Sequence, residues 1–432
     1  MPLPRSVRIP SLPRIHHGSW FKRLSGGLIT GAADDDPSGV ATYSQVGAKF
    51  GYATLWSLLF SLPLMIGIQI ISARIGRVTG MGLGQNMRDH LPRWLVVATI
   101  GLLVIANFIN IGADVAAMGA ALQLLIGGPA IAYGMAFALL SLLLQIFIPF
   151  ARYSPILKLL TASLFAYVAT VFVARVPWAE AFHGAFVPAF QWNREYAVAI
   201  VAILGTTISP YLFCWQAAQE VEEIRASHQR EPLLQKAAQG PDALRRINID
   251  TSVGMLLSNV VAFFIMLTAA AVLHAHGKTD IQTSADAALA LKPLAGRFAF
   301  VLFAAGIIGT GLLAVPVLAG ATAFACSGAT RHVYGLEYTP KQATFFYGVL
   351  VVSMLGGAAL NLTPVDPIKA LYWSAVINGV CAVPMMIAIL VLAQRTSVMG
   401  TFAVRGWLRW LGWTATAVMG VAAVVMFATL GT

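Results

Sequence analysis

The stretch 33-ADDDPSG-39 decides how the rest of the chain is understood. Three consecutive acids lie in an otherwise apolar segment between Leu24 and Gly47, and a proline follows them at once. A charge in a membrane-spanning segment costs roughly 2.5–3.5 kcal/mol on insertion scales, and proline interrupts the hydrogen bonding of a helix. The combination predicts a spanning helix that is broken at mid-depth, where a carboxylate and free backbone carbonyls face a cation.

The composition indicates an integral membrane protein. Of the 432 residues, 58% are hydrophobic and only 10% are charged, whereas soluble domains carry about 25% charged residues. Residues 1–23 contain basic residues and prolines but no acid, so we interpret them as a cytoplasmic tail rather than a cleavable signal peptide. The three cysteines all fall in apolar runs and are expected to be core residues, with no disulfide framework.

Eleven segments are apolar over the length of about 20 residues that a spanning helix needs. They are 24–48 (broken), 52–73, 94–117, 128–149, 155–174, 196–224 (broken), 249–275, 297–327, 342–361, 367–393 and 408–429. Most Lys and Arg residues fall in the segments that this order places on the inner side. We therefore expect a cell (inner or plasma) membrane protein with a cytoplasmic N-terminus and an external C-terminus. This topology explains the net charge of +11 without a nucleic-acid partner.

A second break is predicted at 206-TTISPY-211, in the sixth of these segments. The two broken helices each open a set of five, 24–174 and 196–393, and 408–432 adds an eleventh helix outside the sets. Interrupted helices at corresponding positions indicate a transporter built from inverted repeats, with its binding site at the breaks. The expected fold is all-α.

The candidate ligands lie at these two breaks. Asp36 is the principal one, and the alternative is that it only caps the second half-helix. Carbonyl oxygens of Ala33 and Thr206 would add hard oxygen ligands. The Ser209 hydroxyl would either bind the cation or form a hydrogen bond within its own helix.

Other polar residues have two interpretations each. Asp34 and Asp35 cannot share a side with Asp36, because helix neighbours lie about 100° apart, so one is expected to face a vestibule and the other to bond to protein. Asp114 shares a helix face with Asn107 and Asn110, which indicates either a transport role or bonding between helices.

The inner half of the sixth helix carries a polar face. Gln216, Gln219, Glu220 and Glu223 share this face, which is either a cation exit path or a solvated helix end. Asn378 reaches the site or bonds to another helix.

The sequence argues against ATP-driven pumping and against enzymatic chemistry. It contains no phosphate-binding GxxxxGK[ST] loop and no nucleophile beside a base. We expect no resident cofactor; a divalent ion, Mg²⁺ or Mn²⁺, is the cargo. The lipid bilayer is the other expected partner, and the sequence indicates no protein partner.

The chain resembles the Nramp divalent metal transporters over nearly its whole length. The resemblance rests on 25-SGGLITGAADDDPSGVATYSQVGAKFGYATLW-56, 72-SARIGRVTGMGL-83, Asp250, Asn259 and 281-IQTSADAALALKPLAG-296. It implies the LeuT-type fold of two inverted five-helix repeats.

The departures from the family pattern carry information about the ion. Asp36 and Pro37 keep the family's Asp-Pro, but Ser38-Gly39 replaces its Gly-Asn. Ser209-Pro210-Tyr211 replaces Met-Pro-His, and Ala117 stands where the family has a Glu three residues after its Asp. The resemblance thus implies a site that has lost its Asn and Met ligands and much of its machinery for proton movement.

A thioether favours soft transition ions, so its loss favours a hard ion. Gly39 and Ser209 are also smaller than Asn and Met, and Mg²⁺ tends to keep several waters. The pattern is similar to the Nramp-related magnesium transporters, which implies Mg²⁺ transport without proton coupling, with Mn²⁺ tolerated. The alternative is a proton-coupled Mn²⁺ symporter that uses Asp114, Asp34 or Asp35. A LeuT-type transporter of organic solutes is disfavoured by three adjacent acids.

Overall fold

The computed structural model describes residues 30–31, 33–148, 162–227, 229–363 and 366–430. The expected tail 1–23, the start of the first helix at 24–29 and residues 155–161 of the fifth expected helix lie outside the described residues.

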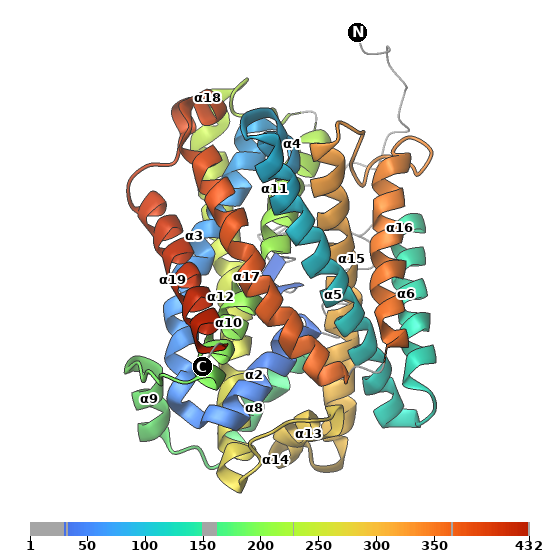
Figure 1. Cartoon of the computed structure of the whole chain (residues 1–432), viewed down its shortest axis with the longest axis vertical. Coiled ribbons are helices and arrows are strands. Elements are labelled where there is room, and N and C mark those ends of the chain that lie inside the picture. Colours follow the sequence, from blue (N-terminus) through green and yellow to red (C-terminus); the bar gives the residue numbers. More distant parts are fainter. Residues whose placement is uncertain (1–29, 32, 149–161, 228, 364–365, 431–432) are drawn as a thin grey trace.

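The described part of the chain folds into helices joined by short loops, with no strand (Figure 1). Nine helical segments in it are long and apolar enough to cross a membrane, the first of which joins α2 and α3. The α-helices are α2 (Pro37–Phe50), α3 (Leu55–Thr79), α4 (Leu83–His90), α5 (Arg93–Ile126), α6 (Ala130–Phe147), α8 (Phe165–Val173), α9 (Trp178–Phe186), α10 (Arg194–Thr207), α11 (Pro210–Arg225), α12 (Gly240–Val272), α13 (Ser284–Ala288), α14 (Lys292–Ala295), α15 (Ala299–Ala329), α16 (Thr344–Ala359), α17 (Pro367–Gln394), α18 (Thr396–Met399) and α19 (Trp407–Leu430).

Both predicted breaks are confirmed, and the same local device makes each of them. Asp36 is extended, with φ −67° and ψ 169°, and α2 begins at the next residue, Pro37. Ser209 is extended, with φ −78° and ψ 132°, and α11 begins at Pro210. Proline fits the first helical position because its fixed φ suits a helix and its missing N–H would have no partner there. Each second half-helix therefore restarts at a proline.

Several helices run beyond the predicted spans. The seventh span, predicted from 249, is α12 and begins at Gly240, with Pro241 in its first turn. The second and third spans continue to Thr79 and Ile126 instead of 73 and 117. Apolar residues mark only the part of a helix that lies in hydrocarbon, whereas the polar turns at its ends are helical too.

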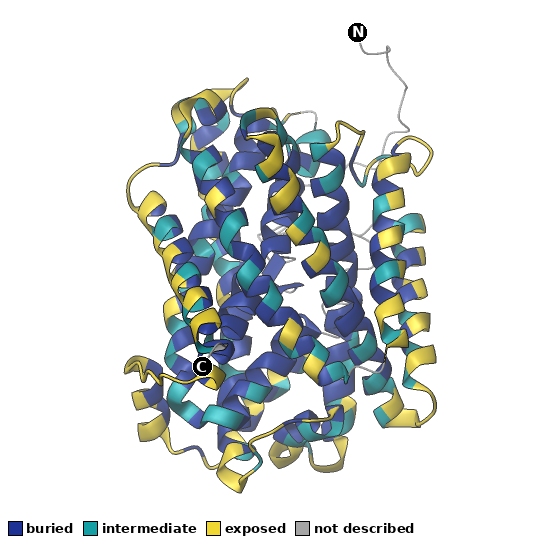
Figure 2. Ribbon diagram, viewed as in Figure 1, coloured by how far each residue is buried: buried dark blue, intermediate teal, exposed yellow. Residues whose placement is uncertain are grey.

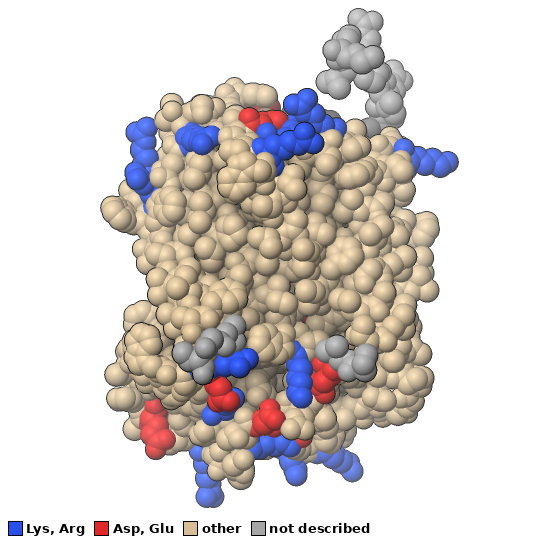
Figure 3. Space-filling view, in the orientation of Figure 1, with Lys and Arg blue, Asp and Glu red and all other residues tan. Residues whose placement is uncertain are grey.

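The surface confirms a multi-pass membrane protein. Lys, Arg, Asp and Glu gather at the two ends of the molecule, and the band between them is almost free of charge (Figure 3). Exposed residues on the outer faces of α6, α16 and α19 surround a buried interior (Figure 2). They include large apolar side chains such as Leu139, Leu143, Val352 and Val424. In water such a belt would be costly, and in a bilayer it is matched by lipid.

The broken helices pack closely against their neighbours. A Cβ atom on Gly205 of α10 would lie 2.0 Å from the carbonyl oxygen of Ala375 in α17. A Cβ atom on Gly76 of α3 would lie 2.2 Å from the carbonyl oxygen of Ala217 in α11. These glycines let the half-helices α10 and α11 approach α17 and α3 at backbone distance.

Candidate cation site

Asp36 lies at the first break with its two carboxylate oxygens in different surroundings. Its Oδ1 accepts hydrogen bonds from the Ser38 hydroxyl (2.6 Å) and the Gly39 backbone N–H (2.8 Å). Its Oδ2 accepts from Asn110 Nδ2 (3.0 Å) and lies 3.4 Å from the Tyr211 hydroxyl. One oxygen therefore caps α2, and the other faces side chains of α5 and α11. The capping role that the sequence suggested is present, and it occupies only half of the carboxylate.

The two breaks lie against each other. Tyr211, two residues after Ser209, donates its hydroxyl hydrogen to the Ala33 carbonyl oxygen at 2.9 Å. A Cβ atom on Gly39 would lie 3.0 Å from Thr206 Oγ1. Asp36, Ala33, Gly39, Thr206 and Tyr211 are thus brought together from positions far apart in the sequence. All are buried.

The Ser209 hydroxyl bonds within its own chain segment. It lies 2.9 Å from the carbonyl oxygen of Gly205 and 3.0 Å from that of Thr206, so it donates its one hydrogen to one of them or shares it between both. These are carbonyls that the interruption leaves without a helical N–H partner. In this conformation the hydroxyl therefore satisfies the end of α10, and a bound ion would compete with that bond.

Asp34 and Asp35 face α12 instead of the second break. The Ser258 hydroxyl lies 2.5 Å from Asp34 Oδ2 and 3.1 Å from Asp35 Oδ1, so it donates to one or shares its hydrogen between them. Both acids are buried, and in this conformation neither opens onto a vestibule. The sequence did not single out Ser258, because one serine in an apolar helix carries no periodic signal.

The polar face of α5 reaches three different neighbours. Asn107 donates to the Leu318 carbonyl and to Thr322 of α15. Asn110 donates to Asp36. Asp114 is fully buried beside the backbone amide of Ser38. The shared spacing predicted one interior face, but it did not mark Asn110 as the member in contact with the break.

Helix α17 contributes further buried polar groups. The Ser374 hydroxyl lies 2.8 Å from Asn110 Oδ1 and 2.7 Å from the Leu371 carbonyl oxygen. Asn378, one turn later, is fully buried, and neither amide atom has a hydrogen-bond partner among the described residues. Asn378 is therefore on the interior side of α17, while Ser374 makes the contact that connects α17 to the break.

The polar face of α11, formed by Gln216, Gln219, Glu220 and Glu223, is called the acidic wall below. Its two glutamates are paired with basic side chains. Arg246 of α12 contacts Glu220 at 2.5 Å and Glu223 at 3.0 Å, and Arg230 also pairs with Glu223. Gln216 Oε1 accepts from Thr30 Oγ1 at 2.5 Å. In this conformation the wall is neither an open path nor a freely solvated helix end. It joins α11 to α12 and to the first half-helix.

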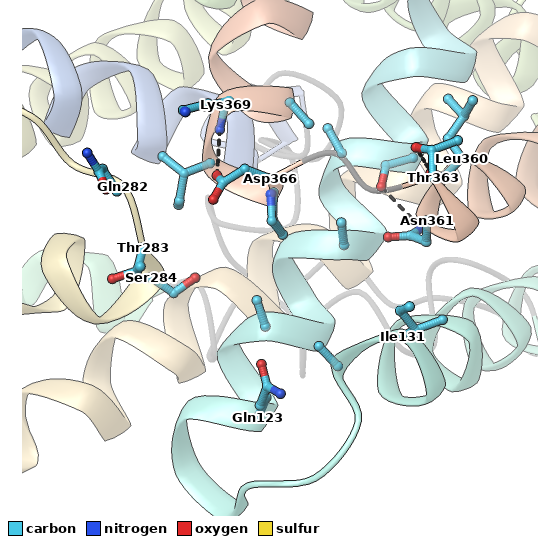
Figure 4. Close-up of a pocket in the computed structure, with 18 of the residues that line it drawn as sticks. Gln123, Ile131, Gln282, Thr283, Ser284, Leu360, Asn361, Thr363, Asp366 and Lys369 are labelled. Carbon is cyan, nitrogen blue, oxygen red and sulfur yellow. Dashed lines mark hydrogen bonds between the residues drawn. The ribbon is translucent and has the colours of Figure 1, made fainter.

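A hollow of about 950 Å³ lies near α13 and the C-terminal half of α5 (Figure 4). Gln123, Gln282, Asn361 and Asp366 are among its lining residues, and it reaches α5 at Gly112 and Ala113, directly before Asp114 in the chain. Nearby in sequence, a hydrogen bond from Gln282 holds the pKa of Asp280 below its usual range. Among the described residues, the lining thus combines neutral polar side chains with one acid, Asp366, and one basic residue, Lys369.

The donors next to the three acids share one chemical character. Among the contacts of the described residues, every side chain that hydrogen-bonds to Asp34, Asp35 or Asp36 is a hydroxyl or an amide, namely Ser38, Asn110, Tyr211 and Ser258. In the same part of the chain, no group of three or more His, Cys, Asp or Glu converges as a metal cluster would. The arrangement thus offers one carboxylate oxygen surrounded by neutral oxygen and amide groups.

Comparison with known proteins identifies the family. The model of the family described as "Natural resistance-associated macrophage protein-like", Nramp, matches residues 27–429. The chain belongs to the Nramp family. A relative named "Divalent metal cation transporter MntH" from Klebsiella pneumoniae subsp. pneumoniae is 26% identical over 398 residues, which cover 89% of this chain and 88% of the relative. Another of the same name, from Pectobacterium carotovorum subsp. carotovorum, is 24% identical over 417 residues, or 95% of each chain.

Solved structures confirm the fold of this Nramp chain. The Eremococcus coleocola manganese transporter, in complex with an aromatic bis-isothiourea substituted compound, superposes with a TM-score of 0.72 at 18% identity, covering 96% of this chain and 88% of that one. Mhp1, a nucleobase-cation-symport-1 family transporter, gives a TM-score of 0.58 at 15% identity, covering 94% and 87%. The expected all-helical transporter architecture is therefore confirmed, and the relatives are transporters, in agreement with the expectation that the chain is not an enzyme.

Proposed function

We propose that this protein carries a divalent metal cation across the membrane by alternating access, and that Asp36 is its principal ligand. The observation that carries the proposal is the Asp36 carboxylate, buried where the two breaks meet, with Oδ1 held by the α2 cap and Oδ2 turned toward Asn110 and Tyr211. A charge at this depth is retained where it binds an ion. The names of the MntH relatives support divalent metals as the class of cargo.

The remaining ligands would come from the same two breaks. The Ala33 carbonyl now accepts from Tyr211, and the Thr206 carbonyl accepts from Ser209. When an ion arrives, these hydroxyls would turn away and leave both carbonyls, together with the Ser209 oxygen, to the ion. Each set of five helices, 24–174 and 196–393, begins with a broken helix. Movement of these broken helices against the other helices would then expose the ion to the opposite side of the membrane.

We propose Mg²⁺ as the preferred ion, with Mn²⁺ accepted and no proton coupling. The groups around Asp36 are hydroxyls, amides and carbonyls, which suit a hard ion that keeps part of its water. This refines the class given by the family and rests on Ser38-Gly39 and Ser209-Pro210-Tyr211 standing at the two breaks.

A second candidate is proton-coupled transport of Mn²⁺. It is favoured by the likeness to the Eremococcus coleocola manganese transporter and by Asp114, a buried acid beside Ser38 that could carry the proton. In that case Asp114 would exchange a proton whenever Asp36 exchanges a metal ion.

One experiment separates the candidates. The purified protein is reconstituted in liposomes, and the influx of Mg²⁺ and of Mn²⁺ is followed together with internal pH. We expect influx of both ions, with the higher catalytic efficiency for Mg²⁺, and no acidification. Acidification driven by the metal gradient would support the symporter, and Mn²⁺ influx without Mg²⁺ influx would overturn the magnesium assignment.

We also propose that the end bearing α4 and α18 lies in the cytoplasm and the end bearing α13 and α14 lies outside, because the basic segments favour that orientation. A membrane-impermeant maleimide applied to intact cells should label Lys292→Cys in α14. It should label Thr396→Cys in α18 only after the cells are permeabilised. The reverse pattern would invert the topology.

A further inference from the structure

Asn110 is the one side chain that connects Asp36 to both α5 and α17 among the described contacts. Its Nδ2 donates to Asp36 Oδ2 at 3.0 Å, and its Oδ1 lies 2.8 Å from the Ser374 hydroxyl. Asn110 and Ser374 are both buried, at 0% and 1% exposure. The amide is therefore held at both ends, away from solvent, by groups whose chemistry fixes its orientation.

The orientation follows from what each partner is able to donate. An ionised carboxylate only accepts hydrogen bonds, so the amide must turn its NH₂ group toward Asp36. Its carbonyl oxygen then faces Ser374, whose hydroxyl must donate to it. With no ion bound, Asn110 thus shields the Asp36 oxygen that the capping bonds leave available.

Ser374 has a second acceptor within reach. Its hydroxyl oxygen lies 2.7 Å from the Leu371 carbonyl, one turn earlier in α17. A hydroxyl carries one hydrogen, so it donates to Asn110 or to Leu371, and its lone pairs accept from a neighbouring N–H when the hydrogen points to Leu371. The Ser374 hydroxyl is therefore able to exchange the roles of donor and acceptor without losing a hydrogen bond.

We propose that Asn110 and Ser374 form a hydrogen-bond switch that lets Asn110 present a donor to the empty site and an oxygen ligand to the cation. This inference rests on the proposed binding of a divalent cation at Asp36. When the cation arrives at Oδ2, the Asn110 amide rotates by half a turn about its Cβ–Cγ bond. Its carbonyl oxygen then faces the ion, its NH₂ donates to Ser374, and Ser374 donates to Leu371. Each group keeps a partner in both states.

The switch gives α5 a direct part in ion selection. A neutral amide oxygen is a hard ligand of the kind that Mg²⁺ and Mn²⁺ accept. Ion binding would also change the hydrogen bonding of α17, because the Ser374 hydroxyl points to Asn110 when the site is empty and to its own helix when the ion is bound. Asn110 is accordingly a ligand and positioning residue, and Ser374 is a positioning residue.

The test compares two substitutions of Asn110 for which the switch predicts different effects on KM. Asn110→Leu is similar in size and removes both donor and oxygen; Asn110→Asp keeps an oxygen for the ion and removes the donor. With Mn²⁺ and Mg²⁺ as probes in liposome flux, we expect Asn110→Leu to raise KM by about tenfold, the worth of one ligand contact. Asn110→Asp should keep KM at or below the wild-type value and lower kcat, because the ion leaves more slowly.

A structural role alone predicts the opposite order, since burying a second charge is costlier than burying Leu. Asn107→Leu is the matched control: Asn107 lies on the same face of α5 but bonds to α15, so its loss should lower thermal stability and leave KM unchanged. Ser374→Ala should raise KM about threefold, and adding it to Asn110→Leu should change nothing further, because the two act as one unit.

The outcomes separate this switch from the proposed function. If Asp36→Asn retains wild-type flux, the proposed site at Asp36 is wrong. If Asp36→Asn is inactive while Asn110→Leu behaves like Asn107→Leu, or while Asn110→Asp raises KM more than Asn110→Leu, the site stands and the switch is overturned.

Discussion

At the first break the carboxylate of Asp36 reaches out of its own helix, whereas at the second break the hydroxyl of Ser209 turns back to the end of the preceding half-helix. Asp36 caps α2 with one oxygen and contacts α5 and α11 through the other. Ser209 directly precedes α11 in the same extended backbone conformation, but its hydroxyl bonds only to Gly205 and Thr206 of α10 among the described residues. Both breaks have an extended residue followed by a proline, but of these two extended residues only Asp36 is charged.

This asymmetry assigns different tasks to the two breaks. The first supplies the charge that holds a cation, and the second supplies neutral oxygens and, through Tyr211, the contact that joins the breaks. Binding strength should therefore depend mainly on the first break and ion preference mainly on the second. Substitutions at Asp36, Tyr211 and Ser209 test this division.

The largest effect is expected from Asp36→Asn. The amide keeps the shape of the side chain but removes the charge, and one of its two ends can no longer accept a hydrogen bond. We expect metal flux in liposomes to fall by at least about 100-fold, because no other carboxylate hydrogen-bonds to Asn110 and Tyr211 among the described residues. Glu231→Gln, at an exposed acid on the loop between α11 and α12, is the control and should keep its flux. Wild-type flux in Asp36→Asn would contradict the division of tasks.

The positions of these groups could be predicted from the sequence only in part. Prolines and acids in apolar segments located both breaks, because each conflicts visibly with a spanning helix. The contacts between breaks could not be foreseen, since Tyr211 and Ala33 meet only through tertiary packing. Asn110 stood out as part of a polar face, but the face does not say which member reaches Asp36.

The ion pairs of the acids on α11 could not be predicted from the sequence either. Spacing placed Glu220 and Glu223 on one face, and the face suggested a wall open to ions or to water. Their partner, Arg246, lies on a different helix, in the part of α12 that precedes the predicted span 249–275. Charge pairing between elements has no periodic signature in either of them, so it became visible only in the fold.

The next largest effect is expected on stability, from Arg246→Leu. This change leaves Glu220 buried without its ion-pair partner, and the loss of one partner of a buried pair costs about 3–5 kcal/mol. We expect a clear fall in thermal stability in detergent, and a faster release of ions to the α11 side because the link between α11 and α12 is lost. Arg245→Leu, at the neighbouring and more exposed position, is the matched control. Equal stability of the two variants would show that the α11 ion pairs contribute nothing.

Tyr211→Phe removes the bond between the breaks and leaves the ring in place. The lost hydrogen bond to the Ala33 carbonyl is worth about 0.5–1.5 kcal/mol, so we expect KM for the metal to change by up to about tenfold. Tyr347→Phe loses a comparable bond to the Tyr338 carbonyl, far from the breaks, and should leave KM as it is. If both variants behave alike, the contact between the breaks has no part in binding.

The smallest effect on rate, and the sharpest on selectivity, is expected from Ser209. Ser209→Ala removes a hydroxyl that bonds to its own helix, so flux of either ion should fall less than about threefold, in line with one modest hydrogen bond. Ser209→Met adds a thioether at the second break, and thioethers favour softer ions. Competition flux should then shift from Mg²⁺ toward Mn²⁺ and Cd²⁺ relative to Ser209→Ala, which serves as the control for the lost hydroxyl. Because the charge of Asp36 is unchanged, Mg²⁺ should still be carried. If Ser209→Met instead abolishes all flux while Ser209→Ala retains it, the second break limits the size of the ion and does not select it by softness.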